Sequence, residues 1–145
     1  MPGNSNPIFS RRGQVANNGT TGMNQLITAA ATDFTGVDAD TSLVFTADAT
    51  NGSWIERLRF KAGGTNVATV ARIYINNGST PTSAANNTFY GELALPATTS
   101  TATAQTSADI DYPMGFALPP GFRIYVGLAT AVSAGWVVTP IAGDY

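Results

Sequence analysis

Frequent turn residues divide the chain into short segments rich in Val, Ile, Thr, Phe and Tyr, and this pattern restricts it to an all-β fold. These residue types suit the pleated surface of a sheet. No stretch shows the sustained apolar spacing and the capping residues of a helix. Eight strands are predicted, at residues 24–31, 42–47, 53–62, 67–76, 89–95, 110–116, 122–129 and 135–141.

Two of the predicted strands alternate between a polar and an apolar side. In residues 54–62, one side of the strand carries Trp54, Glu56, Leu58 and Phe60. The other side carries Ile55, Arg57, Arg59 and Lys61. Residues 67–76 alternate in a similar way. Strands with one wet and one dry face are typical of antiparallel sandwiches. About eight of them predict a single antiparallel β-sandwich of the jelly-roll type, with an immunoglobulin-like sandwich as the alternative.

Turn residues mark the connections between these strands. Asn51-Gly52 predicts a tight hairpin, because both residues tolerate the positive φ of a type I′ turn. Gly63-Gly64 and Asn77-Gly78 are two further turn signals. The Ala/Thr/Ser-rich residues 96–108 are either a loop or a loop that contains a weak strand at 98–106.

Residues 1–22 are interpreted as an extended N-terminal arm, and residues 23–145 as the sandwich domain. The arm holds two prolines, four glycines and four asparagines. Ordering so many residues costs on the order of 20–40 kcal/mol of backbone entropy. The few apolar side chains, at Ile8, Phe9 and Val15, cannot offset that cost alone. The arm is therefore either a frayed terminus or a segment ordered by a neighbouring subunit.

The chain has no histidine and no cysteine, which removes most catalytic chemistry. It can form neither a Ser-His-Asp triad nor a thiolate nucleophile, and no cysteine can ligate a metal. Carboxylates remain, and Asp109 and Asp111 share one side of a strand, but nothing marks them as the matched pair of a glycosidase. The aspartates at 33, 38, 40 and 48 are more typical of turn caps than of a Ca²⁺ site. No enzymatic activity, metal or cofactor is predicted.

The charge balance also limits the partners. Seven basic residues oppose nine acidic ones, which argues against binding to nucleic acid or to an anionic membrane surface. No apolar run reaches the ~20 residues of a membrane span. The N-terminus lacks a signal-peptide pattern. Both tryptophans, Trp54 and Trp136, are expected to be core residues.

The basic stripe Arg57, Arg59 and Lys61, which Arg72 could join, has three interpretations. It is a solvated face, a protection against edge-to-edge aggregation, or a contact with an acidic partner.

Residues 118–128 (LPPGFRIYVGL) resemble the penultimate strand of small virion proteins of tailed bacteriophages. Three further stretches extend the similarity: residues 51–60 (NGSWIERLRF), residues 64–77 (GTNVATVARIYINN), and the C-terminal segments 134–136 and 143–145. Over roughly residues 42–145 the chain is similar to the jelly-roll cement, or decoration, proteins of phage capsids.

The resemblance implies a non-enzymatic structural protein on the outer capsid surface of the virion, made in the host bacterial cytoplasm. Such a protein clamps neighbouring subunits of the major capsid protein and associates with itself as a homodimer or homotrimer. Multivalent contacts would let modest patches hold a shell. The residues expected to bind partners are Ile8, Phe9, Arg11, Arg12, Arg57, Arg59, Lys61 and Arg72. The alternatives are a carbohydrate- or receptor-binding module of a head or tail fibre, using exposed Trp and Tyr, and a glycan hydrolase using Asp109 or Asp111.

Overall fold

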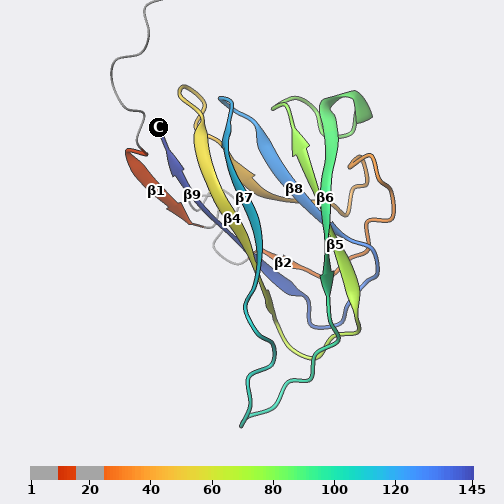
Figure 1. The fold of residues 1–145 in the computed structure, drawn as a ribbon. Coiled ribbons are helices and arrows are strands. Elements are labelled where there is room, and N and C mark those ends of the chain that lie inside the picture. The colour runs from red at the N-terminus through yellow and green to blue at the C-terminus, as the bar shows by residue number, and fades with distance from the viewer. Residues whose placement is uncertain (1–9, 16–24) are drawn as a thin grey trace, which may run out of the picture.

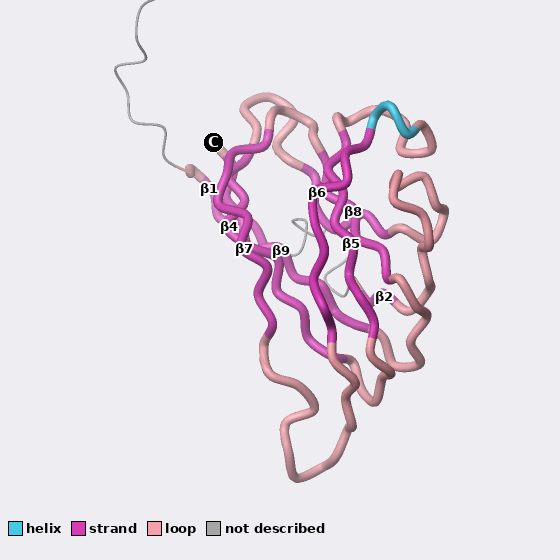
Figure 2. Tube along the Cα trace, turned by 45° about the vertical axis from the view of Figure 1, so that its right-hand side comes forward, coloured by secondary structure: helices cyan, strands magenta, loops and turns pink. Residues whose placement is uncertain are grey.

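Two antiparallel sheets pack face to face (Figures 1 and 2). The computed structural model describes residues 10–15 and 25–145. The first sheet contains β1 (Arg12–Val15), β2 (Leu26–Ile27), β4 (Ser53–Ala62), β7 (Ile110–Leu118) and β9 (Trp136–Asp144). The second contains β3 (Ser42–Thr46), β5 (Thr69–Asn76), β6 (Asn87–Leu95) and β8 (Arg123–Leu128). The predicted all-β antiparallel sandwich is confirmed.

From β2 to β9 the chain passes from one sheet to the other after every strand except β5, because β5 and β6 are neighbours in the second sheet. The first sheet runs β1-β9-β4-β7, and β2 pairs with β9 as well; the second runs β3-β8-β5-β6. Among the described strands, only β5 and β6 are both consecutive in sequence and paired. β6 and β7 are edge strands, and ring contacts from Tyr90 to β7 bring the two edges to the same side of the sandwich.

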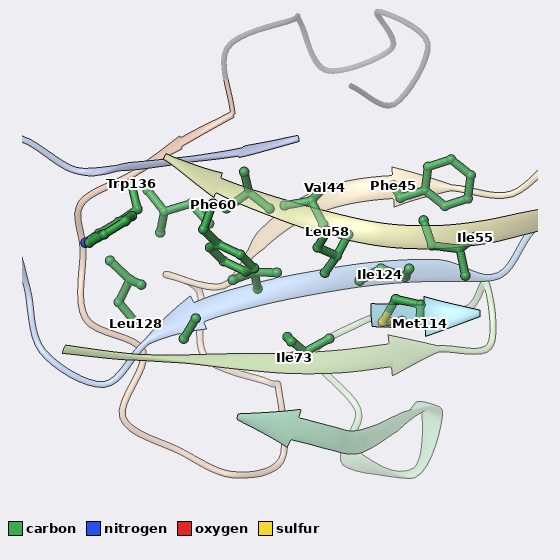
Figure 3. Packing of buried hydrophobic residues seen from close by; sticks show 14 of the residues in the cluster. Val44, Phe45, Ile55, Leu58, Phe60, Ile73, Met114, Ile124, Leu128 and Trp136 are labelled. Atoms are coloured by element: carbon green, nitrogen blue, oxygen red, sulfur yellow. The ribbon is translucent and has the colours of Figure 1, made fainter. Parts of the chain in front are cut away.

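The core lies between the sheets (Figure 3). The first sheet contributes chiefly Ile55, Leu58, Phe60, Trp136 and Val138, and the second contributes Val44, Phe45, Ile73, Ile124 and Leu128. All of these side chains are fully removed from water. Burial of each large apolar side chain contributes roughly 1.5–3 kcal/mol, so this layer holds the sheets together without a disulfide or a metal.

A β-bulge in β4 changes which side chains face the core. The pairing of β4 with β7 and with β9 shifts between Ile55 and Arg57. Ile55 therefore shares the core face with Leu58 and Phe60, and Trp54 lies on the outer face with 37% of its surface exposed. The predicted sides are therefore wrong for residues 54–56 and correct for residues 57–61, and the predicted burial of Trp54 is wrong. The prediction for Trp136 is confirmed, since that residue is completely buried.

Asn51-Gly52 does not form the predicted hairpin, because β3 and β4 lie in different sheets. The turn is built on Asp48, whose Oδ1 accepts hydrogen bonds from the N–H groups of Thr50 and Asn51. Gly52 has a φ of 77°, and a Cβ there would overlap the carbonyl oxygen of Leu118. A turn that requires glycine was therefore predicted correctly, but it connects two strands of different sheets.

The loop between β6 and β7, residues 96–109, extends beyond the ends of the sheets (Figures 1 and 2). Its one sheet-like contact is an isolated bridge between Thr98 and Asn66. Of the two alternatives for this segment, the structure has the loop. The predicted strand at 24–31 is reduced to β2 with a separate bridge at Ala30, and the last strand continues to Asp144.

The predicted N-terminal arm contains a strand of the first sheet. Residues 12–15 form β1, which pairs antiparallel with β9 from Asp144 to Ile141. Residues 1–9 and 16–24 lie outside the described part of the chain. In the part that is described, the helical structure is a single short turn, η2 (Ala84–Asn86), and no helix has the length and hydropathy needed to span a bilayer.

Candidate functional site

The predicted basic stripe on β4 is paired with carboxylates of the same chain. Arg59 lies opposite Asp111 across the β4–β7 ladder and donates two hydrogen bonds to it, with Nε at 2.8 Å from Oδ1 and Nη2 at 3.0 Å from Oδ2. Lys61 Nζ lies 3.0 Å from Asp109 Oδ1. Arg57 Nε lies 3.4 Å from Asp111 Oδ2. We call these five residues the ion-pair face.

Carboxylates of the same chain partly neutralise these three cations, whose side chains stay 34–41% exposed. The bidentate geometry and the charge of Arg59 hold the pKa of Asp111 below its ordinary value, although burial opposes this. A glycosidase acid needs the opposite, a raised pKa that keeps it protonated. The lowered pKa suits Asp111 to an ion pair and not to the role of the protonated acid. The groups of the ion-pair face are partly exposed, so they add little to stability.

Arg72 does not belong to this face. It lies on β5, in the second sheet, where Nε is 3.3 Å from Glu92 Oε1. Its Nη1 donates to the carbonyl oxygens of Ala31 and Thr32, at 3.2 and 2.9 Å. Its guanidinium also stacks over the ring of Phe34, 4.0 Å from the centroid. Arg72 thus fixes the loop before β3 onto the outer face of the second sheet.

Arg12, expected to bind a partner, pairs with a buried carboxylate of its own chain, and its side chain is 61% exposed. Asp144 accepts hydrogen bonds from Arg12 Nη2 at 2.7 Å, from Ser53 Oγ at 2.6 Å and from Gln14 Nε2. Ser53, Gln14 and Asp144 are all buried. We call these four residues the Asp144 cluster. It fixes β1 to β9 and to the start of β4.

Burial raises the pKa of Asp144, but the hydrogen bonds from Ser53, Arg12 and Gln14 outweigh it, so the pKa lies below its ordinary value. The backbone N–H of Arg11 donates to the carbonyl oxygen of Asp144. Ile8 and Phe9, the remaining arm residues expected to bind a partner, lie outside the described residues.

The aspartates considered for Ca²⁺ cap their own turns. Asp33 Oδ1 accepts from the N–H groups of Thr35 and Gly36, and Asp38 accepts from those of Thr32 and Asp40. Among the residues that the structure describes, no three acidic side chains are grouped so as to hold a metal ion. The turn-capping interpretation is confirmed for Asp33, Asp38 and Asp48.

A row of aromatic rings, which the sequence analysis missed, crosses the edge of the second sheet. It consists of Phe34, Phe89, Tyr90, Tyr112 and Phe116, and we call it the aromatic belt. Phe34 and Phe89 meet edge to face with centroids 5.5 Å apart. Tyr90 lies 6.2 Å from Tyr112 and 5.4 Å from Phe116. The belt thus consists of two groups of contacts that adjoin at β6. Phe34 and Phe89 pack together beside Tyr74, and Tyr90 packs on Tyr112 and Phe116 of β7, which also contact the core.

A bulge and a glycine make the belt possible. Phe89 pairs with Tyr74 and Gly91 with Ile73, which leaves Tyr90 as the extra residue of β6 and turns its ring toward β7. A Cβ on Gly91 would overlap the hydroxyl of Tyr112. The adjacent aromatics Phe89-Tyr90 were the only available sequence signal, because an alternating strand must send one of two neighbours outward.

No family model, curated protein or solved structure matches this chain.

Proposed function

We propose that the chain is a structural virion protein, a jelly-roll cement or decoration protein on the outer surface of a tailed-phage head. It clamps neighbouring subunits of the major capsid protein, associates with itself, and has no enzymatic activity. Residues 118–128 and the other stretches that resemble such proteins motivate this proposal.

The strand order is the observation that carries the proposal. Counted from β2 as the first strand, one sheet holds strands 1, 8, 3 and 6 and the other holds 2, 7, 4 and 5. This alternation is the order expected for two Greek keys wound into a jelly roll. It supports the architecture that the resemblance implied and favours the jelly roll over the immunoglobulin-like alternative. A fold alone does not specify a function, so the proposal needs a direct test.

The test is the copy number of this chain, relative to the most abundant shell protein, in virions purified from its source. A cement protein should be present in many copies, at a fixed ratio to the shell protein. A few copies per particle would indicate a fibre or receptor module. Absence from the particle would overturn the virion role.

A binding measurement locates the contact. Deletion of residues 1–9 removes Ile8 and Phe9 but leaves β1 and its Asp144 cluster intact. If these residues bind the shell, the deletion should lower the affinity of the purified protein for undecorated shells and leave its thermal unfolding unchanged. Arg59→Gln, which breaks only the ion-pair face, is the matched surface variant and should bind as the wild type does.

A carbohydrate- or receptor-binding module is the second candidate, favoured by the exposure of Trp54. Its ring lies on the outer face of the first sheet, and its Nε1 is 3.3 Å from Glu56 Oε2. Aromatic rings beside a carboxylate suit the apolar face and the hydroxyls of a sugar. A glycan screen tests this: binding that is lost in Trp54→Ala and kept in Val67→Ala, a change at an exposed residue elsewhere, would support the module.

A further inference from the structure

We infer that the aromatic belt and the free edge of β6 form a two-fold interface between two copies of this chain. The inference rests on the self-association in the proposed function, not on the capsid partner. It names the surface and the symmetry: β6 of one copy lies antiparallel to β6 of the other, and the belts pack beside the paired strands.

β6 is the least protected edge of the described sandwich. Natural sheets block edge-to-edge pairing with proline, charged residues, bulges or very short strands. β7, the other edge on this side, contains Pro113 and the positive-φ Gly115. β3 has only five residues and an irregular register, and the outer edge of β9 is covered in two pieces by β1 and β2.

The nine residues of β6, NTFYGELAL, include no proline and no cation. Residues 88–94 are all exposed or half-buried. β6 does contain a bulge, at Tyr90, and one charged residue, Glu92, but Glu92 is paired with Arg72, and the strand keeps nine residues without a break. The ring of Tyr90 is 40% exposed and adds to the apolar area beside the edge. An edge of this kind favours pairing with another strand.

The charge of the belt is compatible with a second copy of itself. Its five members are uncharged, and the one charged residue of β6, Glu92, already forms a pair with Arg72 within the chain. Interface centres are rich in aromatic residues and poor in unpaired charge. Because Arg72 neutralises Glu92 within each copy, the presence of Glu92 in both copies adds little like-charge repulsion. The same edge supplies both partners, and such a self-complementary contact closes about a two-fold axis.

The area is consistent with the centre of a dimer interface. Phe34, Phe89 and Tyr90 are 55, 39 and 40% exposed. At about 200 Å² for an aromatic side chain, they present roughly 270 Å² per copy. A standard interface buries about 800 Å² per partner. The belt thus accounts for about a third, and the backbone edge with Thr88, Glu92 and Ala94 would supply a rim.

The experiment is sedimentation analysis of the purified full chain over a range of concentrations, without any shell. The wild type should be a dimer in reversible equilibrium. Phe34→Ser combined with Phe89→Ser should raise the dimer Kd at least ~10-fold, the usual effect of losing aromatic anchors. Val67→Ser is the matched control, because Val67 is 58% exposed but lies outside the belt, and it should leave the Kd unchanged. The far-ultraviolet circular dichroism and the Tm of each variant check that it is folded.

A second measurement does not depend on weakening the interface. The chain has no cysteine, so Ala94→Cys introduces a single site for a spin label on β6. For two antiparallel copies of β6, the two labelled positions should lie within roughly 30 Å, given about 3.4 Å per residue and under 5 Å between strands.

Three results would overturn the inference: a wild type that stays monomeric or forms a trimer, an unchanged Kd in the double variant, or a longer distance between the labels. Because no capsid is present, these results are independent of the copy number in virions. The dimer can therefore stand if the cement role fails, and the cement role can stand if the dimer fails.

Discussion

Replacing Asp144 by alanine should destabilise the fold and release β1. Asp144 is the shared acceptor for Ser53, Gln14 and Arg12, and no other side-chain contact between β1 and the rest of the chain involves a buried charge among the residues described. Val15, the one apolar residue of β1, is largely exposed. β1 is therefore held by its ladder with β9 and by the Asp144 cluster, not by core packing.

The magnitude follows from the burial of the partners. The substitution leaves the hydroxyl of Ser53 and the amide of Gln14 without their acceptor, and both residues are buried. Each unsatisfied buried group costs about 1–3 kcal/mol. The side chain of Arg12 is 61% exposed and can be hydrated, so it adds little. We expect a loss of about 4 kcal/mol in the free energy of unfolding, which for a chain of this length lowers the Tm by roughly 10–15 °C.

Urea unfolding and thermal scanning measure the loss, and hydrogen exchange of residues 11–15 measures the release of β1. Asp111→Ala is the matched control: it removes a carboxylate from a position that is 35% exposed, where water can replace the ion pairs, and should have a much smaller effect. Equal losses in the two variants would refute the reasoning that burial decides the cost. Unchanged exchange at residues 11–15 in Asp144→Ala would refute the assignment of β1 to this cluster.

Three further predictions concern pH, packing and fluorescence. Because the pKa of Asp144 is lowered in the folded chain, its charge should stabilise the fold fully above the unfolded pKa of about 4, and this stabilisation should be lost as the pH falls through the folded pKa. The difference in the free energy of unfolding between the wild type and Asp144→Asn should therefore shrink in acid. Gly91→Ala should destabilise the chain by about 1–3 kcal/mol in urea unfolding, since its Cβ overlaps the tyrosine hydroxyl from β7, while Gly13→Ala, with no atom within 4 Å of the added Cβ, should not. Trp54→Phe should shift the fluorescence maximum to shorter wavelength and reduce iodide quenching, because the remaining Trp136 is buried; Trp136→Phe should do the reverse, and equal quenching in both would contradict the assigned burial.

The antiparallel sandwich was predictable because the alternation of apolar and polar residues is a local property. The bulge in β4 was not. Nothing around Glu56 distinguishes a strand with one extra residue from a regular one, and that residue moves Trp54 from the predicted core to the surface. A single change of register reverses every side chain that follows or precedes it.

The ion-pair face and the aromatic belt could not be predicted, because each is formed by residues that are far apart in the sequence. Arg59 and Asp111 were both noticed in the sequence, one as a partner-binding cation and the other as a hydrolase carboxylate. Only the β4–β7 register shows that they neutralise each other. The aromatic belt likewise needs Phe34 from a loop and Tyr90 from a bulge to meet at one edge, which no periodicity in either segment predicts.

The strand order also has a consequence for the time at which the protein can fold. β4 lies between β7 and β9, which begin about 50 and 75 residues after β4 ends. The first sheet therefore cannot close until the ribosome has passed residue 144. Of the strands that the structure describes, only β5 and β6 can pair as sequence neighbours during synthesis. A chain dominated by such long-range pairs folds slowly, on the order of milliseconds to seconds. Until then the apolar faces of its early strands are open to other nascent chains.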